Sequence, residues 1–199
     1  MSILKIAQLG EPVLRARARE VVPHEIGSAA LERLIDDMVE TMRDSDGAGL
    51  AAPQVYQSIR LCVIELDNNP RYPELPEQPL LVLINPVVTC LVAEPVADKD
   101  AIEMYEGCLS VQGIRGNVRR PRKVGFSALD RAGQPIQGEF EGLHAAVIQH
   151  ETDHLDGVLF VDRADSRSLC FLREFGRHVP ARLRYRDPAN ADLITVREH

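Results

Sequence analysis

Residues 149–157 have the sequence QHETDHLDG, which contains the pattern His-Glu-x-x-His. On a helix, residues four apart lie on one face with their Cβ atoms about 5–6 Å apart. His150 and His154 can therefore point at one metal ion, while Glu151 can reach a metal-bound water without ligating the metal. This stretch predicts a helix that supplies two metal ligands and one proton acceptor.

The sequence around this stretch supports the helical interpretation. Upstream, Leu143, Ala146 and Val147 continue the apolar stripe that carries the two histidines, at the i, i+3/i+4 spacing of a helix face. Gly157 is a natural helix end, because glycine adopts the left-handed conformation without strain. The alternative is a buried helix whose histidines belong to the core.

A catalytic site of this kind needs a third protein ligand and one open position. The protease pattern His-x-x-Gly-x-x-His is not continued, because Phe160 stands where its last histidine would be. Glu174 lies 20 residues after His154 and is a second candidate. It falls on a predicted amphipathic helix, where a solvated position is favoured. A cysteine is the third candidate.

Only one of the four cysteines has a neighbourhood that suggests chemistry. Cys62, Cys90 and Cys170 lie in apolar segments and are typical of small buried hydrophobic residues. Cys108 follows Gly107, which leaves the backbone accessible, although a buried inert cysteine remains the alternative. No pair forms Cys-x-x-Cys, so a reducing compartment is the simplest expectation.

Length and composition predict a single catalytic domain over residues 1–199, with a C-terminal helix and tail from about residue 166. Apolar residues make up 45% of the chain and charged residues 27%, as in soluble globular proteins. The net charge of −7 argues against DNA binding. No apolar run is long enough for a membrane span. The N-terminus resembles neither a signal nor a transit peptide, so we expect a cytoplasmic, bacterial-type protein.

Periodicity and turn residues predict the remaining elements. A helix over 28–44 should be capped by Ser28, and a last helix over 166–178 by Ser166. The glycine-rich stretch 46–54 is either a plain loop or a binding loop, but it lacks the Lys-Ser/Thr ending of a phosphate loop. We predict a surface loop over 67–79, a hairpin turn over 130–134, and strands over 59–66, 80–84, 86–92, 117–129 and 136–140.

Three stretches together resemble the three motifs of the peptide deformylase family. They are residues 47–54 (GAGLAAPQ), 106–110 (EGCLS) and 149–154 (QHETDH), and the resemblance runs from about residue 4 to 165. One departure is Gln112, where the family usually has a proline. The resemblance implies an α+β domain in which antiparallel sheets surround a central metal-binding helix. It also implies a metal-dependent hydrolase that removes the formyl group from the N-terminal formyl-methionine of new polypeptides and releases formate.

The resemblance also implies a role for each residue at a matching position. Cys108, His150 and His154 would hold one ion. The resemblance implies Fe²⁺ as the native ion, with Zn²⁺, Ni²⁺ or Co²⁺ as substitutes. Glu151 would carry the proton from water to the leaving amine. The Gln54 side chain and the Leu109 backbone N–H would stabilise the oxyanion. The substrate would contact Ala48, Gly49, Glu106, Arg115, Leu143 and Val147, with core packing the competing role for the apolar ones and a surface ion pair for Arg115.

The C-terminal part has a local positive charge. Residues 167–186 contain six arginines and one acidic residue, Glu174, a local charge of +5. We hypothesise that this helix docks on ribosomal RNA, and a solvated basic face is the alternative. Two rival functions also remain at this point. One is a metallopeptidase that uses His150, His154 and Glu174, and the other is a non-catalytic metal-binding domain.

Overall fold

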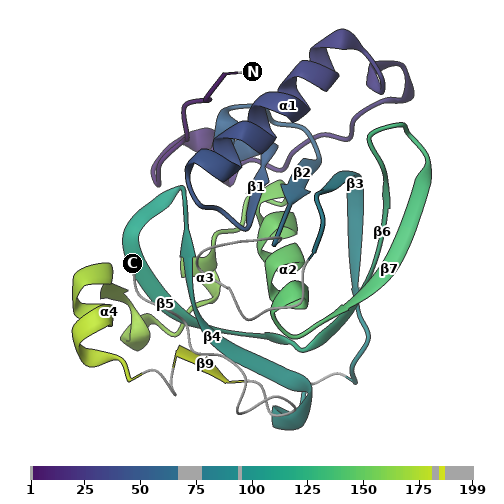
Figure 1. Cartoon of the computed structure of the whole chain (residues 1–199). Helices are drawn as coiled ribbons and strands as arrows, with labels where there is room; N and C mark the ends of the chain where they lie inside the picture. Colours follow the sequence, from purple (N-terminus) through teal and green to yellow (C-terminus); the bar gives the residue numbers. More distant parts are fainter. Residues whose placement is uncertain (1, 67–77, 94–95, 181–183, 187–199) are drawn as a thin grey trace.

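The computed structural model describes residues 2–66, 78–93, 96–180 and 184–186. Most of the predicted surface loop 67–79, one of the six C-terminal arginines, Arg182, and the tail after residue 186 lie outside these ranges. Within them, the chain forms a small α+β fold with two antiparallel sheets, as predicted (Figure 1).

The first long helix, α1, spans Ala29–Asp44 and confirms the prediction for this segment. The Ser28 hydroxyl accepts a hydrogen bond from the Leu31 N–H and so satisfies a free donor of the first turn. The face that carries Ile35, Met38 and Met42 is fully buried. It packs against strands β1 and β2, on one side of the first sheet (Figure 1).

The first sheet has five antiparallel strands in the order β1-β2-β3-β6-β7. Two predicted strands, 80–84 and 86–92, are a single strand, because a register shift between Ile84 and Val87 absorbs the Asn85-Pro86 pair. Asn85 has φ +52°, and its side-chain amide bonds the backbone N–H and C=O of Val21. The strands are β1 Gly49–Ala51, β2 Leu61–Ile64, β3 Leu81–Cys90, β6 Lys123–Leu129 and β7 Pro135–Glu141.

The second sheet is built on a long hairpin and has the order β8-β5-β4-β9. Strands were predicted over 117–129, and two are found there: β5 ends at Pro121, and β6 begins at Lys123 in the other sheet. The strand before it, β4, was not predicted. The strands are β4 Ala101–Cys108, β5 Val111–Pro121, β8 Cys170–Phe171 and β9 Tyr185–Arg186.

The helix α2, Leu143–Leu155, lies between the five-stranded sheet and the β4–β5 hairpin (Figure 1). It contains the predicted His-Glu-x-x-His stretch and is buried over most of its length. Gly157, with φ +74°, follows its end as expected. The core on its apolar side joins Ala146 and Ile148 to residues of β2 and β3.

The C-terminal helix differs from the prediction. Residues Cys170–Phe171 hydrogen-bond as a strand to the edge of β5, so the helix α4 begins only at Leu172 and ends at His178. Ser166 begins a separate 3-10 turn, in which the Asp165 carboxylate accepts from the Arg167 N–H. The other short helices are Pro12–Arg15, Pro23–Glu25, Ala52–Val55, Asp98–Asp100 and α3, Phe160–Arg163.

A bilayer-spanning helix is not found among the described residues, because none of their helices combines the necessary length with sufficient apolar character.

Candidate metal centre

Three side chains from distant parts of the chain converge beside α2. The Cys108 thiol at the end of β4 and the imidazoles of His150 and His154 on α2 have ligand atoms within 4.8 Å of one another. The Cys108 Sγ lies 3.3 Å from the His154 Nε2. Glu174, the alternative third ligand, does not join them, because it lies on α4 and pairs with Arg177 and His178.

The three groups suit a borderline-soft divalent ion. One sulfur and two imidazoles leave room for a fourth ligand, the arrangement of catalytic rather than structural sites. His154 is buried, and burial, with the nearby His150, holds its pKa well below the usual range. It is therefore neutral, which ligation requires. The donor set and its convergence fit a metal ion.

Glu106 orients the other imidazole. Its Oε2 lies 2.8 Å from the His150 Nδ1, which leaves the Nε2 of that ring available as a ligand. Arg120 holds the same carboxylate in a two-point contact, with Nε to Oε1 at 2.5 Å and Nη2 to Oε2 at 3.0 Å. Glu106, predicted to face the substrate, lines the pocket, and it also contacts both His150 and Arg120.

The Glu106–Arg120 pair is almost completely enclosed, with exposed fractions of 4% and 3%. Burial alone would favour the neutral acid, but the charge and hydrogen bonds of Arg120, with those of His150, outweigh it and lower the pKa of Glu106 to about 2. Burial likewise opposes the charge of Arg120, but the carboxylates of Glu106 and Asp153 outweigh this effect and raise the pKa of Arg120 above its ordinary value. Glu106 is therefore a fixed anion beside His150.

Glu151 faces the same pocket without ligating. Its carboxylate is 4% exposed, and its Oε2 has no hydrogen-bond partner among the described residues. Burial raises the pKa of Glu151 to about 7, against the opposing charge of His150. Gly49 makes room for this carboxylate, because a Cβ there would lie 2.5 Å from the Glu151 Oε1. The glycine in β1 is thus required by the close approach of α2.

Gln54 presents its amide nitrogen to the cysteine. Its Oε1 accepts from the Ala51 N–H at 2.8 Å, which orients the side chain. Its Nε2 lies 3.4 Å from the Cys108 Sγ and 3.2 Å from the Ser110 Oγ. Leu109, between them, lines the pocket, and its carbonyl accepts from the Gln8 side chain at 3.1 Å. A donor on Gln54 therefore points at the place where the three ligand side chains meet.

The pocket beside these groups has an apolar end. Ala48 and Val147 line it as predicted, whereas Leu143, also predicted there, is buried in the hydrophobic core instead. Leu143 begins α2, two turns before His150, so the helix carries it past the pocket. Met104 of β4 lines the pocket and was missed, because β4 itself was not predicted. The full lining is Gly47, Ala48, Gly49, Gln54, Met104, Glu106, Gly107, Cys108, Leu109, Ala146, Val147, His150 and Glu151.

Arg115 lies just outside this lining. Its guanidinium crosses the backbone of Gly107 so closely that a Cβ at position 107 would lie 1.7 Å from the Arg115 Nη1. Gly107 lines the pocket, and Arg115 lies against the face of Gly107 where a side chain would begin. Gln112, the departure from the family pattern, is exposed in β5 just beyond the Cys108–Val111 pair.

Comparisons with known proteins agree with this geometry. The family model described as polypeptide deformylase matches residues 3–169. A peptide deformylase of Leptospira biflexa is 44% identical over 170 residues, which cover 85% of this chain and 92% of that protein. Peptide deformylase 1 of Nitrosomonas europaea is 40% identical over 174 residues, covering 87% and 92% of the two chains.

Solved structures give the same result. A class I type b peptide deformylase from Acinetobacter baumannii with Met-Ala-Ser bound superposes with a TM-score of 0.73 at 39% identity, covering 82% of this chain and 99% of that one. The peptide deformylase of Thermotoga maritima superposes with a TM-score of 0.70 at 34% identity, covering 83% and 99%.

Proposed function

Since the chain belongs to the polypeptide deformylase family, we propose that Cys108, His150 and His154 hold the ion of its active site. The enzyme is a metal-dependent hydrolase that removes the N-formyl group from nascent peptides. The observation that carries the site assignment is the convergence of one thiol and two imidazoles beside a pocket that also contains Glu151 and Gln54. We take residues 1–199 as one catalytic domain.

Fe²⁺ is the ion that we propose for the cell, and Zn²⁺, Ni²⁺ and Co²⁺ suit the same donors. A bound ion of this kind acts as a Lewis acid toward the formyl group and makes water more acidic. Elemental analysis of protein purified without oxygen and without added metal would test the choice. A preparation that is fully active and contains only zinc would contradict it.

Glu151 is the residue that we assign to proton transfer. Water adds to the formyl carbon, the C–N bond then breaks, and formate and a free amine leave. Glu151 accepts a proton from the attacking water and delivers it to the amine nitrogen. Its burial and its unpartnered Oε2 support this role, because nothing else among the described residues engages that oxygen.

Gln54 is the donor that we assign to the developing oxyanion, together with the Leu109 backbone N–H. Gln54→Met should lower kcat on formyl-Met-Ala-Ser by about 10²–10³, the usual cost of one such donor. Bound metal should stay unchanged, since Gln54 is not a ligand. Gln57→Met, an exposed glutamine three residues on, is the control and should be silent. Equal rates for the two variants would remove Gln54 from this role.

The substrate would lie extended along β1, with its methionine side chain in the apolar end of the pocket. In the described sheet β1 is an edge strand, and although its Ala51 N–H donates to Gln54, its outer edge around Gly49 can take strand addition. Ala48, Met104, Ala146 and Val147 provide the apolar walls. The Met-Ala-Ser held by the Acinetobacter baumannii relative is the product expected from such a substrate.

One assay distinguishes this function from its rivals. Formyl-Met-Ala-Ser and an N-acetylated peptide with internal bonds are each incubated with the protein, with and without chelator. We expect free amine from the formyl peptide alone, and only when the ion is present. Internal cleavage would indicate the metallopeptidase. Metal binding without turnover of either peptide would indicate a non-catalytic metal-binding domain.

Ribosome docking is a separate proposal, and it would place the enzyme in the cytoplasm beside emerging chains. Arg167, Arg173 and Arg177 are exposed, but Arg184 is not, because it stacks on Phe175 and donates to backbone carbonyls. We expect the double variant Arg173→Glu/Arg177→Glu to weaken co-sedimentation with ribosomes, most clearly at low salt.

The control for docking carries the same change in charge on another part of the chain. Arg17 and Arg33 are exposed arginines of the N-terminal half, so Arg17→Glu/Arg33→Glu matches the double variant. If both double variants sediment equally with ribosomes, the basic C-terminal residues are only a solvated face.

A further inference from the structure

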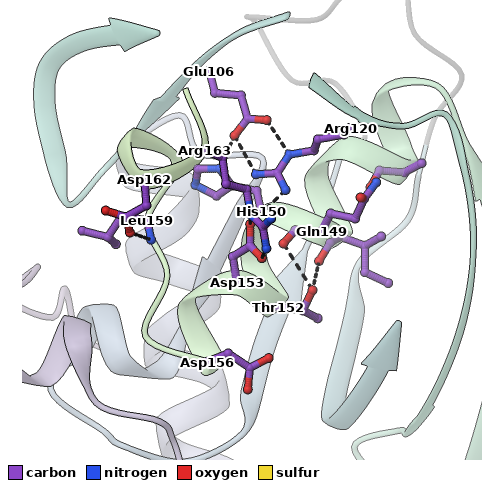
Figure 2. Close-up of polar contacts among 12 residues, drawn as sticks. Glu106, Arg120, Gln149, His150, Thr152, Asp153, Asp156, Leu159, Asp162 and Arg163 are labelled. Atoms are coloured by element: carbon purple, nitrogen blue, oxygen red, sulfur yellow. Dashed lines mark hydrogen bonds and ion pairs between the residues drawn. The ribbon is translucent and has the colours of Figure 1, made fainter. Parts of the chain in front are cut away.

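The metal-binding imidazole His150 is the inner end of a chain of charged contacts that reaches the protein surface. The contact of His150 with Glu106 and the two-point contact of Glu106 with Arg120 continue outward. The Arg120 Nη1 donates to the Asp153 Oδ2 at 2.9 Å. Arg163 then donates to both oxygens of Asp153, from Nε to Oδ2 and from Nη2 to Oδ1, each at 2.6 Å (Figure 2).

Exposure rises from Arg120 outward. The side chains of Arg120 and Asp153 are 3% and 13% exposed, and that of Arg163 is 47% exposed. The charges alternate, so Arg120 and Arg163 balance Glu106 and Asp153. Four elements contribute, because Glu106 is on β4, Arg120 on β5, Asp153 on α2 and Arg163 on α3.

Arg120 connects the inner carboxylate, Glu106, to the outer one, Asp153. A guanidinium is a planar fork, so carboxylates at two of its edges fix its orientation. Glu106 occupies one edge and Asp153 contacts Nη1. Without the Asp153 carboxylate, Glu106 would be the one carboxylate that contacts Arg120 among the described residues. The carboxylate that orients His150 would then be held by an arginine that is itself less fixed. Arg163 in turn contacts both carboxylate oxygens of Asp153 and so fixes their orientation.

We propose that Asp153 and Arg163 are positioning residues for the metal ligand His150 and act on it through Arg120 and Glu106. The inference rests on the proposed function, since it takes His150 as a ligand. Residues beyond the direct ligands commonly change metal affinity by about 10–100-fold. Neither Asp153 nor Arg163 is among the residues that line the substrate pocket. Asp153 shares α2 with both histidines, so the Arg163 variants, which change a residue of α3, are the ones that test the outer contacts.

The test is the dissociation constant of Zn²⁺, measured by competition with a chelator, supported by the visible absorption bands of Co²⁺ bound to the same variants. Asp156→Asn is the matched control. Asp156 lies three residues after Asp153 and pairs with Arg60 at 2.7 Å, but it does not contact Arg120. Thermal unfolding of the metal-free proteins shows whether each variant folds.

We expect Asp153→Asn to weaken Zn²⁺ binding about tenfold and to shift the Co²⁺ bands, whereas Asp156→Asn should stay within about twofold of wild type. Arg163→Gln should weaken binding in the same direction, and Arg163→Lys should restore part of it, because a cation remains beside Asp153. Arg163 is exposed, so these two variants decide the matter even if Asp153→Asn fails to fold.

Two results would overturn the inference. If Arg163→Gln binds Zn²⁺ as tightly as wild type, the outer contacts only join α2 to α3. If the wild-type protein binds no stoichiometric ion, the proposed metal site fails first and the inference with it. These two failures are distinguished by the wild-type titration alone.

Discussion

We expect Cys108→Ala to yield a protein that purifies without its ion and does not turn over formyl-Met-Ala-Ser. The thiolate is the only sulfur among the three converging ligand groups, and the two imidazoles alone leave the ion with too few protein donors. Elemental analysis after gel filtration measures the result directly. The loss of metal should be nearly complete. An outer contact commonly changes metal affinity by about 10–100-fold, and a direct ligand contributes more.

Cys170→Ala is the control for this experiment. Cys170 is another free cysteine, lies on β8 and is outside the group of ligand side chains. That variant should retain one ion per chain and full activity. If Cys108→Ala also retained one ion per chain, Cys108 would not be a ligand. The third ligand position would then belong to another group, and the proposed mechanism would lose its basis.

Helices α1 and α2, with His150 and His154 on one face of α2, were predictable because their signals are local. The stripe of Ile35, Met38 and Met42 and the Ser28 cap define α1 without reference to any other segment. His150 and His154 share a helix face through their spacing alone. The pairing with Cys108 was not predictable from spacing, because the cysteine lies 42 residues before His150 in the sequence (150 − 108). It came from the resemblance of three stretches to one family.

The support around the site depends on long-range pairing, so sequence patterns did not show it. Met104 and Glu106 reach the pocket because they share a face of β4, a strand that was not predicted. Arg120 meets Glu106 because the hairpin register places Ile102 opposite Arg120 and Gly116 opposite Glu106, so that the arginine extends along the same face. A prediction of strands over 117–129 that does not say where one ends and the next begins could not give that register.

The C-terminal segment shows a local signal that another contact overrides. Ser166 has the residue type of a helix cap, yet the free edge of β5 pairs with Cys170–Phe171 and delays the helix to Leu172. Unpaired strand edges are strong sites for such additions. The same physics supports the proposed binding of an extended substrate along the edge strand β1.

Glu151→Gln should keep the ion and lose turnover. The two side chains have the same shape, so the close approach to Gly49 is preserved. Glutamine cannot accept and return a proton, and general acid–base transfer of this kind is worth about 10²–10⁴ in rate. The fold should tolerate the change, because burial raises the pKa of Glu151 to about 7 and a neutral side chain suits that environment.

The decisive measurement is kcat on formyl-Met-Ala-Ser for a preparation whose metal content equals that of wild type. Glu151→Asp supplies the comparison, since it keeps a carboxylate but withdraws it by one methylene from the pocket. It should fall between wild type and Glu151→Gln if position and proton transfer both matter. Near wild-type turnover by fully loaded Glu151→Gln would mean that the proton travels through another group. Among the described pocket residues, the remaining carboxylate is Glu106, which Arg120 and His150 already engage.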